Sequence, residues 1–514
     1  MNGAESLART LVASGVNTCF TNPGTSEMHF VAALDRVEGI RCVLALFEGV
    51  VTGAADGYGR MTRKPACTLL HLAPGLGNGL ANLHNASRAR SPIVNIVGDH
   101  ATYHKQHDAP LNADIEGIAR AYSKWLKTSP DALSVAAGGA AAVAAASAAP
   151  GRIATLILPA DTAWGEGSGI APPVPVPPPA AVAAEAVEAA ARMLRAGLPT
   201  ALLLDGAALR RDGLVLAGRI AAATGAQLLS PYSVGRIERG AGLVPVERVP
   251  YPVDQALERL KPLSQLILVG ARAPVAFFAY PGKPSVVTPE GCAIHTLALP
   301  EDDLVGALDA LAGAVGARRA EPALQRLDRP ARPQGKVTLP GIAATIASLL
   351  PENVIVVDES ITSGRGLLPA TRGAPPHDWL ANPGGSIGMA LPLAVGAAVA
   401  CPDRKVLCLE GDGSGMYTLQ ALWTMAREGL QVTAVVFANR TYQILKGELA
   451  QVGAGNPGRR ALDMLEIGRP DLDWVGLARG MGVPAARAET LDELGRLVAG
   501  GLAAPGPSLV ELVV

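Results

Sequence analysis

Residues 405–445 constrain the fold more than any other stretch, because they have the pattern of a strand, a helix and a second strand. The first apolar run, 406–409, is followed by the glycine turn GDG at 411–413. The second run, 432–438, is rich in β-branched residues and stops at Asn439. Apolar residues between the runs recur at helical spacing, which predicts a helix. Two consecutive strands joined through a helix are expected to pair in parallel.

Asp412 and Asn439 each follow one of these strands. Because parallel strands end at the same edge of a sheet, the two side chains are expected to be neighbours where α/β proteins bind ligands. A carboxylate, an amide oxygen and nearby backbone carbonyls form an all-oxygen set that suits Mg²⁺ or Ca²⁺. The set is too small to hold the ion alone, so phosphates of a ligand would complete it beside the glycine turn. The alternative interpretation is an ordinary glycine turn and a strand-ending asparagine.

Length and composition restrict the possible classes of protein. A chain of 514 residues is too long for one hydrophobic core, and its 49% hydrophobic and 17% charged content is typical of globular proteins. A net charge of −1 argues against a nucleic-acid partner. The six cysteines show no C-x-x-C spacing, which favours free thiols in a reducing, cytoplasmic compartment. Neither a signal peptide nor a membrane span is predicted.

Repeated alternation of strand and helix patterns predicts three α/β domains, each a doubly wound parallel sheet with helices on both faces. Two proline-rich segments, one of them reading APPVPVPPPAAVAA, are expected to be linkers because they cannot hold regular structure. The predicted domains are 1–170, 185–316 and 337–514, and the predicted linkers are 171–184 and 321–335.

Glu48 is an acidic residue inside the apolar sequence LALFEGVV, at the start of an expected helix. A carboxylate among apolar neighbours is costly to ionise, so such a group can exchange protons near neutral pH. The alternative is an exposed glutamate in the first turn of a helix, where it favours the helix dipole.

The sequences LFEGVVTGAADGYGR and LLHLAPGLGNGLANL, taken with the GDG turn and Asn439, resemble enzymes that use thiamine diphosphate (ThDP). Nearly the whole chain is similar to the superfamily of acetolactate synthase, pyruvate oxidase and benzoylformate decarboxylase. Within it, the overall sequence most resembles an acetolactate synthase large-subunit-like branch. The resemblance implies a pyrimidine-binding domain, a central domain and a diphosphate-binding domain. It also implies ThDP and Mg²⁺ as cofactors and a 2-oxo acid as the substrate.

The resemblance further implies roles for single residues on the cofactor side. Glu48 stands where a family glutamate hydrogen-bonds the aminopyrimidine ring and activates the cofactor. The metal ligands would be Asp412, Asn439 and the backbone carbonyl of Thr441. Gly385 would offer a backbone carbonyl to the aminopyrimidine. The remaining cofactor-binding residues would be Thr362, Ile387, Gly411, Gly413, Ser414 and Tyr442, of which Ile387 would wedge the cofactor into a bent shape.

Two residues on the substrate side resemble benzoylformate decarboxylase in particular. His71, in LHLAPGLGN, stands where that enzyme has a catalytic histidine, and Thr25, in NPGTSE, stands where it has a serine. The alternative for His71 is a packed histidine bonded to backbone. The second catalytic histidine of that enzyme is missing, because residues 275–285 read VAFFAYPGKPS. His104 and His107 are candidate substitutes, or else belong to a loop surface.

These features predict a ThDP- and Mg²⁺-dependent lyase or carboligase that acts on a 2-oxo acid. Acetolactate synthase proper is an alternative, although its loop glutamine is replaced near Leu111 and no flavin-binding signature is visible in 185–316. Alternatives of other classes are a nucleotide-binding oxidoreductase, which would need a G-x-G-x-x-G fingerprint, and a catalytically silent ThDP-binding paralogue. The resemblance implies a homodimer or homotetramer with active sites between subunits, so that Glu48 and Asp412 of one site come from different chains.

Overall fold

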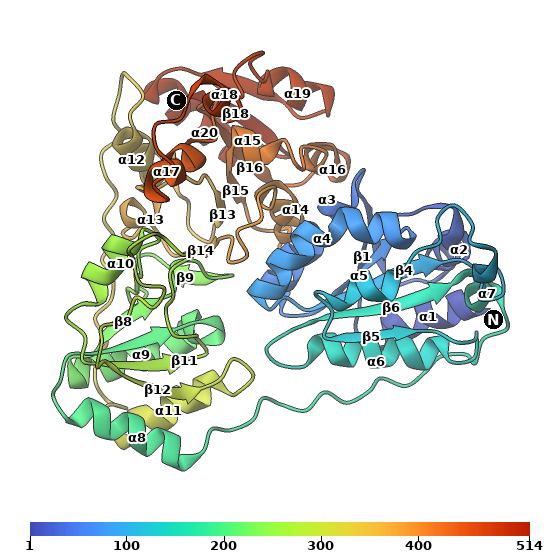
Figure 1. Cartoon of the computed structure of the whole chain (residues 1–514), viewed down its shortest axis with the longest axis horizontal. Helices are drawn as coiled ribbons and strands as arrows, with labels where there is room; N and C mark the ends of the chain where they lie inside the picture. The colour runs from blue at the N-terminus through green and yellow to red at the C-terminus, as the bar shows by residue number, and fades with distance from the viewer.

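The computed structural model describes residues 1–514 and confirms three parallel-sheet α/β domains (Figure 1). The first domain, drawn in blue to cyan, contains a six-stranded sheet whose strands are all parallel. In sheet order the strands are β2 (Arg41–Leu44), β1 (Thr18–Asn22), β3 (Ala66–Leu70), β4 (Ile93–Asp99), β6 (Ile153–Pro159) and β5 (Trp125–Thr128). The helices are α1 (Gly3–Ala13), α2 (Met28–Arg36), α3 (Glu48–Thr62), α4 (Leu72–Ala89), α5 (Ile115–Arg120), α6 (Val135–Ser147) and α7 (Ala160–Trp164). Strands β3, β4 and β6 are buried along their whole length, as expected for a parallel sheet covered on both faces.

The second domain, green to yellow in Figure 1, has a five-stranded parallel sheet. In sheet order its strands are β10 (Glu247–Arg248), β8 (Gln227–Ser230), β7 (Thr200–Leu204), β11 (Gln265–Val269) and β12 (Ala293–Ala298). Its helices are α8 (Ala184–Arg195), α9 (Arg211–Thr224), α10 (Val253–Leu260) and α11 (Leu304–Ala314). Residues 171–183, which precede α8, contain no helix or strand, and Figure 1 shows them as an extended chain that leaves the first domain.

The third domain, yellow-orange to red, has a seven-stranded sheet. In sheet order its strands are β17 (Ala485–Ala488), β18 (Ser508–Val513), β16 (Val432–Ala438), β15 (Val406–Gly411), β13 (Ile355–Glu359), β14 (His377–Leu380) and β9 (Ile237–Arg239). Its helices are α12 (Leu339–Leu349), α13 (Leu367–Ala370), α14 (Ala390–Ala400), α15 (Asp412–Gly415), α16 (Ala421–Glu428), α17 (Gln443–Gln451), α18 (Arg459–Asp463), α19 (Trp474–Gly480) and α20 (Leu491–Ala503). Strands β15 and β16 pair in parallel, as predicted from the pattern in 405–445.

Strand β9 belongs by sequence to the middle of the chain, yet it pairs antiparallel with β14 at the edge of the third sheet. Beside it, Asp378 of β14 accepts hydrogen bonds from Arg236 Nε at 2.6 Å and Arg404 Nη2 at 2.7 Å. Burial disfavours the ionised form of Asp378, but the two guanidinium groups outweigh burial and lower its pKa. Residues 236–239 are therefore held against the third domain by backbone pairing and by the largely buried ion pair of Arg236 with Asp378.

Helices α3 and α14 hold the first and third domains together, and residues of both domains share one hydrophobic core. A Cβ atom added to Gly396 of α14 would lie 1.8 Å from the carbonyl oxygen of Ala54 in α3. A Cβ added to Gly57 of α3 would lie 2.2 Å from the carbonyl oxygen of Leu393. The two backbones therefore approach each other more closely than any residue with a side chain allows.

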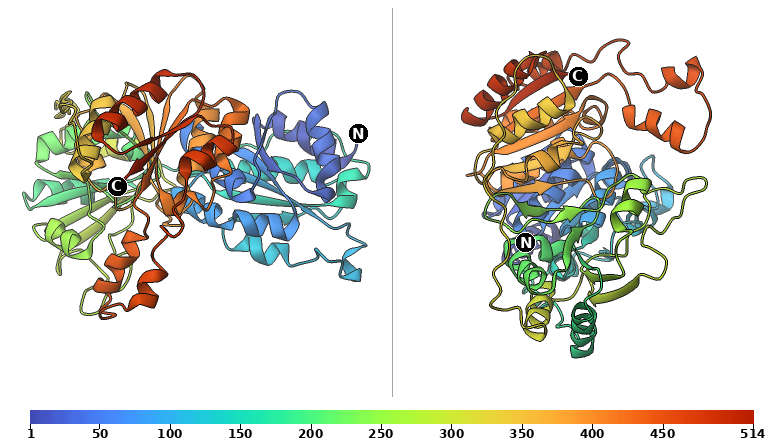
Figure 2. Two further views of the ribbon diagram at one scale, coloured as in Figure 1. Left: turned by 90° about the horizontal axis from the view of Figure 1, so that it is seen from above. Right: turned by 90° about the vertical axis from the view of Figure 1, so that its left-hand side faces the viewer.

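The segment that carries α17 and α18 stands apart from the rest of the third domain. Both views of Figure 2 show these orange-red helices projecting from its body. Neither helix buries any residue, and Leu445 and Met464 are exposed apolar side chains of this segment. No helix in the chain has both the length and the apolar character that crossing a membrane requires.

The contact between α3 and α14 predicts opposite effects of two glycine-to-alanine changes in helices. Gly396→Ala should lower stability by about 3 kcal/mol, because its methyl group overlaps a backbone oxygen that cannot move alone. Gly500→Ala in α20 is the matched control, since nothing lies within 4 Å of the added Cβ. It should be neutral or stabilise by up to about 1 kcal/mol through helix propensity. Midpoints of thermal unfolding measure both effects, and equal midpoints would contradict the close contact.

Candidate active site

The ends of β15 and β16 bring Asp412 and Asn439 side by side. Asp412 is buried, and its Oδ1 accepts a hydrogen bond from the backbone N–H of Gly413 at 2.9 Å. Its Oδ2 accepts one from the N–H of Arg440, the residue after Asn439, at 2.6 Å. The carboxylate of one strand end is thus bonded to the backbone of the other strand end. This is the arrangement that the parallel pairing predicts.

The chemistry of this pair suits a hard cation. Burial raises the pKa of Asp412 to about 6, even though the two backbone N–H groups favour its ionised form. Asn439 Oδ1 accepts a hydrogen bond from Thr441 N at 3.1 Å, and the carbonyl oxygen of Thr441 has no hydrogen-bond partner in the protein. No cluster of three or more His, Cys, Asp or Glu side chains that could hold a metal occurs in the chain. Asp412, Asn439 and the Thr441 carbonyl are oxygen donors of the type that hard cations prefer, and three of them would leave further positions for oxygens of a ligand.

Gly413 of the GDG turn and Gly415, two residues further on, are closely packed. A Cβ on Gly413 would lie 2.5 Å from the ring of Tyr442, and one on Gly415 would lie 2.7 Å from the ring of Trp474. Between them, Ser414 Oγ donates a hydrogen bond to Glu410 Oε1 at 2.5 Å. Thr362 lies in the turn after β13, is partly buried and makes no side-chain hydrogen bond. The hydroxyl group of Thr362 therefore has no hydrogen-bond partner in the protein.

The loop before α14 contains Gly385 and Ile387 and is held by side chains rather than by regular structure. Asn382 Oδ1 accepts hydrogen bonds from Gly384 N at 3.2 Å and Gly385 N at 2.8 Å. Its Nδ2 donates to Ser386 O at 2.7 Å. The carbonyl oxygen of Gly385 and the N–H of Ile387 are left without a partner in the protein. Both groups are therefore free for a ligand, and for Gly385 this is the group that the sequence resemblance assigns to the aminopyrimidine.

Glu359, at the end of β13, holds the other end of this loop. Its Oε2 accepts hydrogen bonds from three successive N–H groups, those of Gly388, Met389 and Ala390, at 3.1, 2.7 and 3.0 Å. Burial nevertheless raises the pKa of Glu359 to about 7. The pKa of the neighbouring Glu410 is raised well above its usual range by burial and by the charge of Glu359. The loop is therefore anchored on a carboxyl group that titrates near neutral pH.

Glu48 is the first residue of α3 and is buried. Its Oε2 accepts a hydrogen bond from Asn78 Nδ2 of α4 at 3.0 Å. A Cβ on Gly75 would lie 3.2 Å from its Oε1, so this side of the carboxyl group is closely packed. No hydrogen bond joins Glu48 to Asp412 or to the GDG turn within the chain.

His71 lies against Glu27, a residue that sequence reasoning missed. His71 Nδ1 is 2.9 Å from Glu27 Oε2 and 3.4 Å from Ser26 Oγ, whereas Thr25 makes no side-chain hydrogen bond. Glu27 Oε2 also accepts from Gly24 N at 2.8 Å, and a Cβ on Gly24 would overlap the His71 ring. The signal for Glu27 was its position three residues after Gly24, which is the spacing of a capping box.

His104 and His107 do not join this group of residues. Both are exposed on the loop that contains the short 3₁₀ helix η2 (Lys105–His107), and their rings pack against each other with centroids 5.7 Å apart. Neither makes a side-chain hydrogen bond to His71.

The second domain contributes an aromatic group beside the loop of Gly385. A Cβ on Gly385 would lie 2.8 Å from the ring of Phe277, so the two are in contact.

Glu448 of α17 accepts hydrogen bonds from the hydroxyls of Tyr280 at 3.3 Å and Tyr251 at 3.4 Å. Glu448 and Tyr251 were not predicted, because the helix and loops that carry them are far apart in the sequence.

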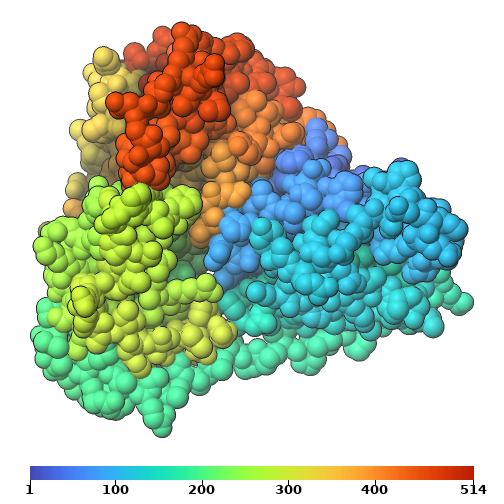
Figure 3. Space-filling model, viewed as in Figure 1, coloured from blue at the N-terminus to red at the C-terminus, as the bar shows by residue number.

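A cavity of about 1200 Å³ lies between the first and second domains, and Figure 3 shows a hollow between their surfaces. Its lining includes Arg88, Tyr251, Phe277 and Pro383, the last of which belongs to the loop before α14. Asp412 and Glu48 are not part of the lining. The cavity therefore reaches the loop before α14 but is separate from the Asp412 and Asn439 pair.

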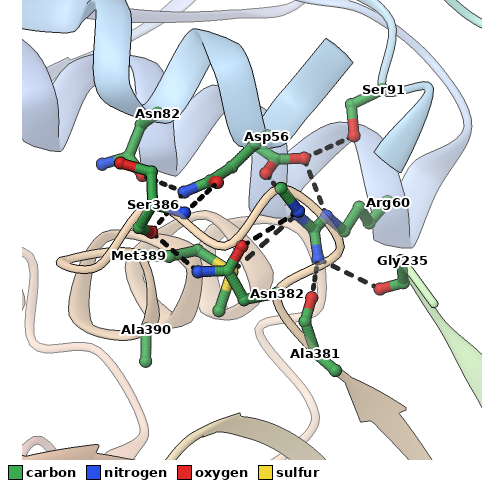
Figure 4. Close-up of polar contacts among 12 residues, drawn as sticks. Asp56, Arg60, Asn82, Ser91, Gly235, Ala381, Asn382, Ser386, Met389 and Ala390 are labelled. Atoms are coloured by element: carbon green, nitrogen blue, oxygen red, sulfur yellow. Dashed lines mark hydrogen bonds and ion pairs between the residues drawn. The ribbon is translucent and has the colours of Figure 1, made fainter. Parts of the chain in front are cut away.

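Arg60 of α3 joins all three domains (Figure 4). It forms a buried ion pair with Asp56, with Nη2 and Oδ2 2.5 Å apart. Its Nη1 donates to the carbonyl oxygens of Gly235 at 3.1 Å and Ala381 at 2.6 Å. Ala381 directly precedes Asn382, so this guanidinium group fixes where the loop before α14 begins.

Two family models match the chain. The model described as the N-terminal TPP binding domain of thiamine pyrophosphate enzymes matches residues 1–118. The model described as the C-terminal TPP binding domain of thiamine pyrophosphate enzymes matches residues 367–512. The first range contains Glu48 and His71, and the second contains Asp412 and Asn439.

Similar proteins span the whole chain. A Mycobacterium tuberculosis protein, provisionally named the acetolactate synthase large subunit IlvX, is 52% identical over 100% of this chain and 99% of its own length. Benzoylformate decarboxylase of Pseudomonas aeruginosa is 29% identical over 97% of this chain and 96% of its own length. The solved structure of a thiamine diphosphate-dependent 4-hydroxybenzoylformate decarboxylase from Rhodococcus jostii RHA1 has a TM-score of 0.84. It is 23% identical, covers 99% of this chain and 98% of that chain, and supports the fold.

Replacement of Glu359 by glutamine tests the buried anchor of the loop. Because burial raises the pKa of Glu359 to about 7, the folded protein keeps a proton that the unfolded chain releases above about pH 4.3. As the pH falls from about 8 to about 5, the wild-type free energy of unfolding should rise relative to that of Glu359→Gln by about 1–3 kcal/mol. Urea unfolding at both pH values measures the change. Glu188→Gln, at an exposed ion pair, is the control and should show no such change; a Glu359→Gln difference that does not vary with pH would contradict the raised pKa.

Proposed function

The chain belongs to the ThDP-dependent enzymes of the acetolactate synthase and benzoylformate decarboxylase type, and from this we propose that it is an Mg²⁺-dependent lyase or carboligase acting on a 2-oxo acid. The substrate loses CO₂, and the product is an aldehyde or, with a second carbonyl compound, an acyloin. The observation that carries the proposal is the pairing of Asp412 with Asn439 at adjacent strand ends, beside the free carbonyl of Thr441. Such a set matches a cation that bridges to a diphosphate.

The third domain would hold the cofactor through its metal and its diphosphate. Asp412, Asn439 and the carbonyl oxygen of Thr441 would bind Mg²⁺, and the metal would keep Asp412 ionised despite its burial. When bound, ThDP supplies a nucleophilic carbon and a place to store the electrons left by decarboxylation. The residues proposed to contact the diphosphate and the rings are Thr362, Gly385, Ile387, Gly411, Gly413, Ser414 and Tyr442.

The first domain would supply the proton-transferring groups. Glu48 is proposed to hold a proton against the pyrimidine ring, with Asn78 fixing one oxygen of its carboxyl group. His71 is proposed to transfer a proton on the substrate side, oriented by the carboxylate of Glu27. Thr25 would lie beside it, where a hydroxyl group can bind a substrate carboxylate. Glu48 and Glu27 are buried and His71 is partly buried, whereas Thr25 is exposed.

We propose that the active form is a cytoplasmic homodimer or homotetramer with active sites between subunits. Glu48 and Asp412 share no hydrogen bond within one chain: Glu48 is bonded to Asn78 of the first domain, and Asp412 is bonded to backbone N–H groups of the third domain. Two chains would then bring Glu48 of one to the Asp412 side of the other. In such an assembly an isolated chain would lack one half of each site.

Acetolactate synthase activity is the second candidate within the same family. The observation in its favour is the 52% identity to the Mycobacterium tuberculosis protein named for that activity. The His71 and Glu27 pair favours the decarboxylase reading, because it places a proton-transferring imidazole next to a carboxylate. The two candidates differ in product, so chemical analysis separates them.

The protein supplied with ThDP and MgCl₂ should release CO₂ from at least one 2-oxo acid. A panel of pyruvate, 2-oxobutyrate and benzoylformate, followed by product analysis, distinguishes an aldehyde from an acetohydroxy acid. Release should depend on added Mg²⁺, because the protein supplies only three oxygen ligands. Tight ThDP binding without CO₂ release from any acid would favour a catalytically silent paralogue instead.

Two substitutions separate the proposed halves of the site. Glu48→Gln should leave ThDP bound while slowing CO₂ release by about 100-fold or more, because the proton-transferring group is lost. Asp412→Ala should instead abolish the Mg²⁺-dependent part of ThDP affinity measured by calorimetric titration. Asp309→Ala, at an exposed ion pair, is the control that should leave both quantities unchanged.

Mixing the two inactive variants under subunit exchange tests whether a site is shared between chains. A mixed dimer would contain one site in which both Glu48 and Asp412 are intact. Recovery of activity supports sites between subunits. If mixed dimers form and stay inactive, the shared site is rejected.

A further inference from the structure

One face of α4 carries three asparagines, Asn78, Asn82 and Asn85. Spacings of four and three residues place them on the same side of the helix. Asn78 donates its side-chain hydrogen bond to Glu48. Asn82 and Asn85 donate hydrogen bonds to the loop before α14, which contains the proposed cofactor-facing residues.

Asn82 donates hydrogen bonds from a single amide nitrogen to both α3 and the loop before α14. Its Nδ2 donates to the carbonyl oxygen of Gly49 at 2.8 Å, next to Glu48 in the first turn of α3. The same nitrogen donates to the carbonyl oxygen of Gly388 at 3.2 Å, next to Ile387. Asn82 is 2% exposed, so no water replaces these bonds without a rearrangement.

Asn85 fixes the middle of the loop. Its Nδ2 donates to Ser386 O at 2.8 Å, and its Oδ1 accepts from Ser386 N at 3.2 Å, so both backbone groups of that residue are bonded. Asn85 Nδ2 also donates to Asn82 Oδ1 at 3.1 Å, which joins the two amides. The pair thus determines where the backbone on either side of Ile387 lies.

Two backbone groups of the loop before α14 have no hydrogen-bond partner, and both lie between the positions that are bonded. Bonds from Asn382, Asn85, Glu359 and Asn82 engage the loop on both sides of Gly385 and Ile387. The Gly385 carbonyl and the Ile387 N–H have no partner. A loop without regular structure would otherwise sample other conformations, at a cost in binding when a ligand orders it.

We propose that Asn82 and Asn85 are positioning residues, which fix the Gly385 and Ile387 loop for the cofactor held by its own chain and, through the same bonds, fix the helix start at Glu48 that serves the partner chain's site. This inference rests on the proposed function. It goes beyond that function because neither asparagine is expected to contact the cofactor or the substrate. Asn82 acts through two backbone carbonyls, and Asn85 acts through the backbone of Ser386.

The test compares full-length variants for ThDP affinity in MgCl₂, for exchange of the ThDP C2 proton, and for thermal stability without ThDP. Asn82→Ala should weaken ThDP binding and slow the exchange, each by about ten-fold or more, because small displacements of a binding group have large effects. Asn85→Ser should do the same to a smaller extent. Asn95→Ala is the matched control, since Asn95 is an equally buried asparagine that bonds only Thr68 and Thr155 within the first sheet.

The control should lose stability but keep affinity and exchange within about two-fold of wild type, because its bonds lie away from the loop. If Asn82→Ala and Asn85→Ser also lose only stability, the positioning role is wrong and the two residues serve folding alone. If Asn82→Ala does not fold, Asn85→Ser decides by the same criteria. Wild-type protein that binds no ThDP would instead reject the proposed function, and this inference with it.

Discussion

The arrangement of the site depends on one contact, the packing of α3 against α14 without room for a methyl group between them. Glu48 begins α3, and the loop of Gly385 and Ile387 leads into α14. Because the two helices meet backbone to backbone, their first turns cannot slide independently, and the groups at those turns keep a fixed separation. Asn82, Arg60 and Glu359 then add polar bonds to a geometry that close packing has already set.

The features that follow from local pattern were accessible from the sequence. The apolar runs around the GDG turn predicted two parallel strands, and parallel strands must end at the same edge. The contact between Asp412 and the backbone after Asn439 follows from those two statements alone. Glu48 was recognised because an acidic residue is conspicuous inside an apolar run, and the structure finds it buried.

The features that depend on contacts between residues far apart in the chain could not be predicted from the sequence. Strand β9 is a short segment whose partner β14 lies far along the chain, and nothing in residues 237–239 points to it. Asn82 and Asn85 resemble many other helical asparagines until their contacts with Gly388 and Ser386 are seen. Tyr251 and Glu448 could not be predicted either, because their hydrogen bond forms only where the second and third domains meet.

Strand β9 has a consequence for how the chain could be divided. A fragment released by cleavage at both proline-rich segments would carry β9 away with the middle of the chain. The third sheet would then end at β14 with a row of unpaired backbone groups, and Asp378 would lose one of its two cations. Such an edge invites pairing with other chains. The three domains are therefore interdependent parts rather than exchangeable modules, and recombination between relatives should preserve β9 together with β14.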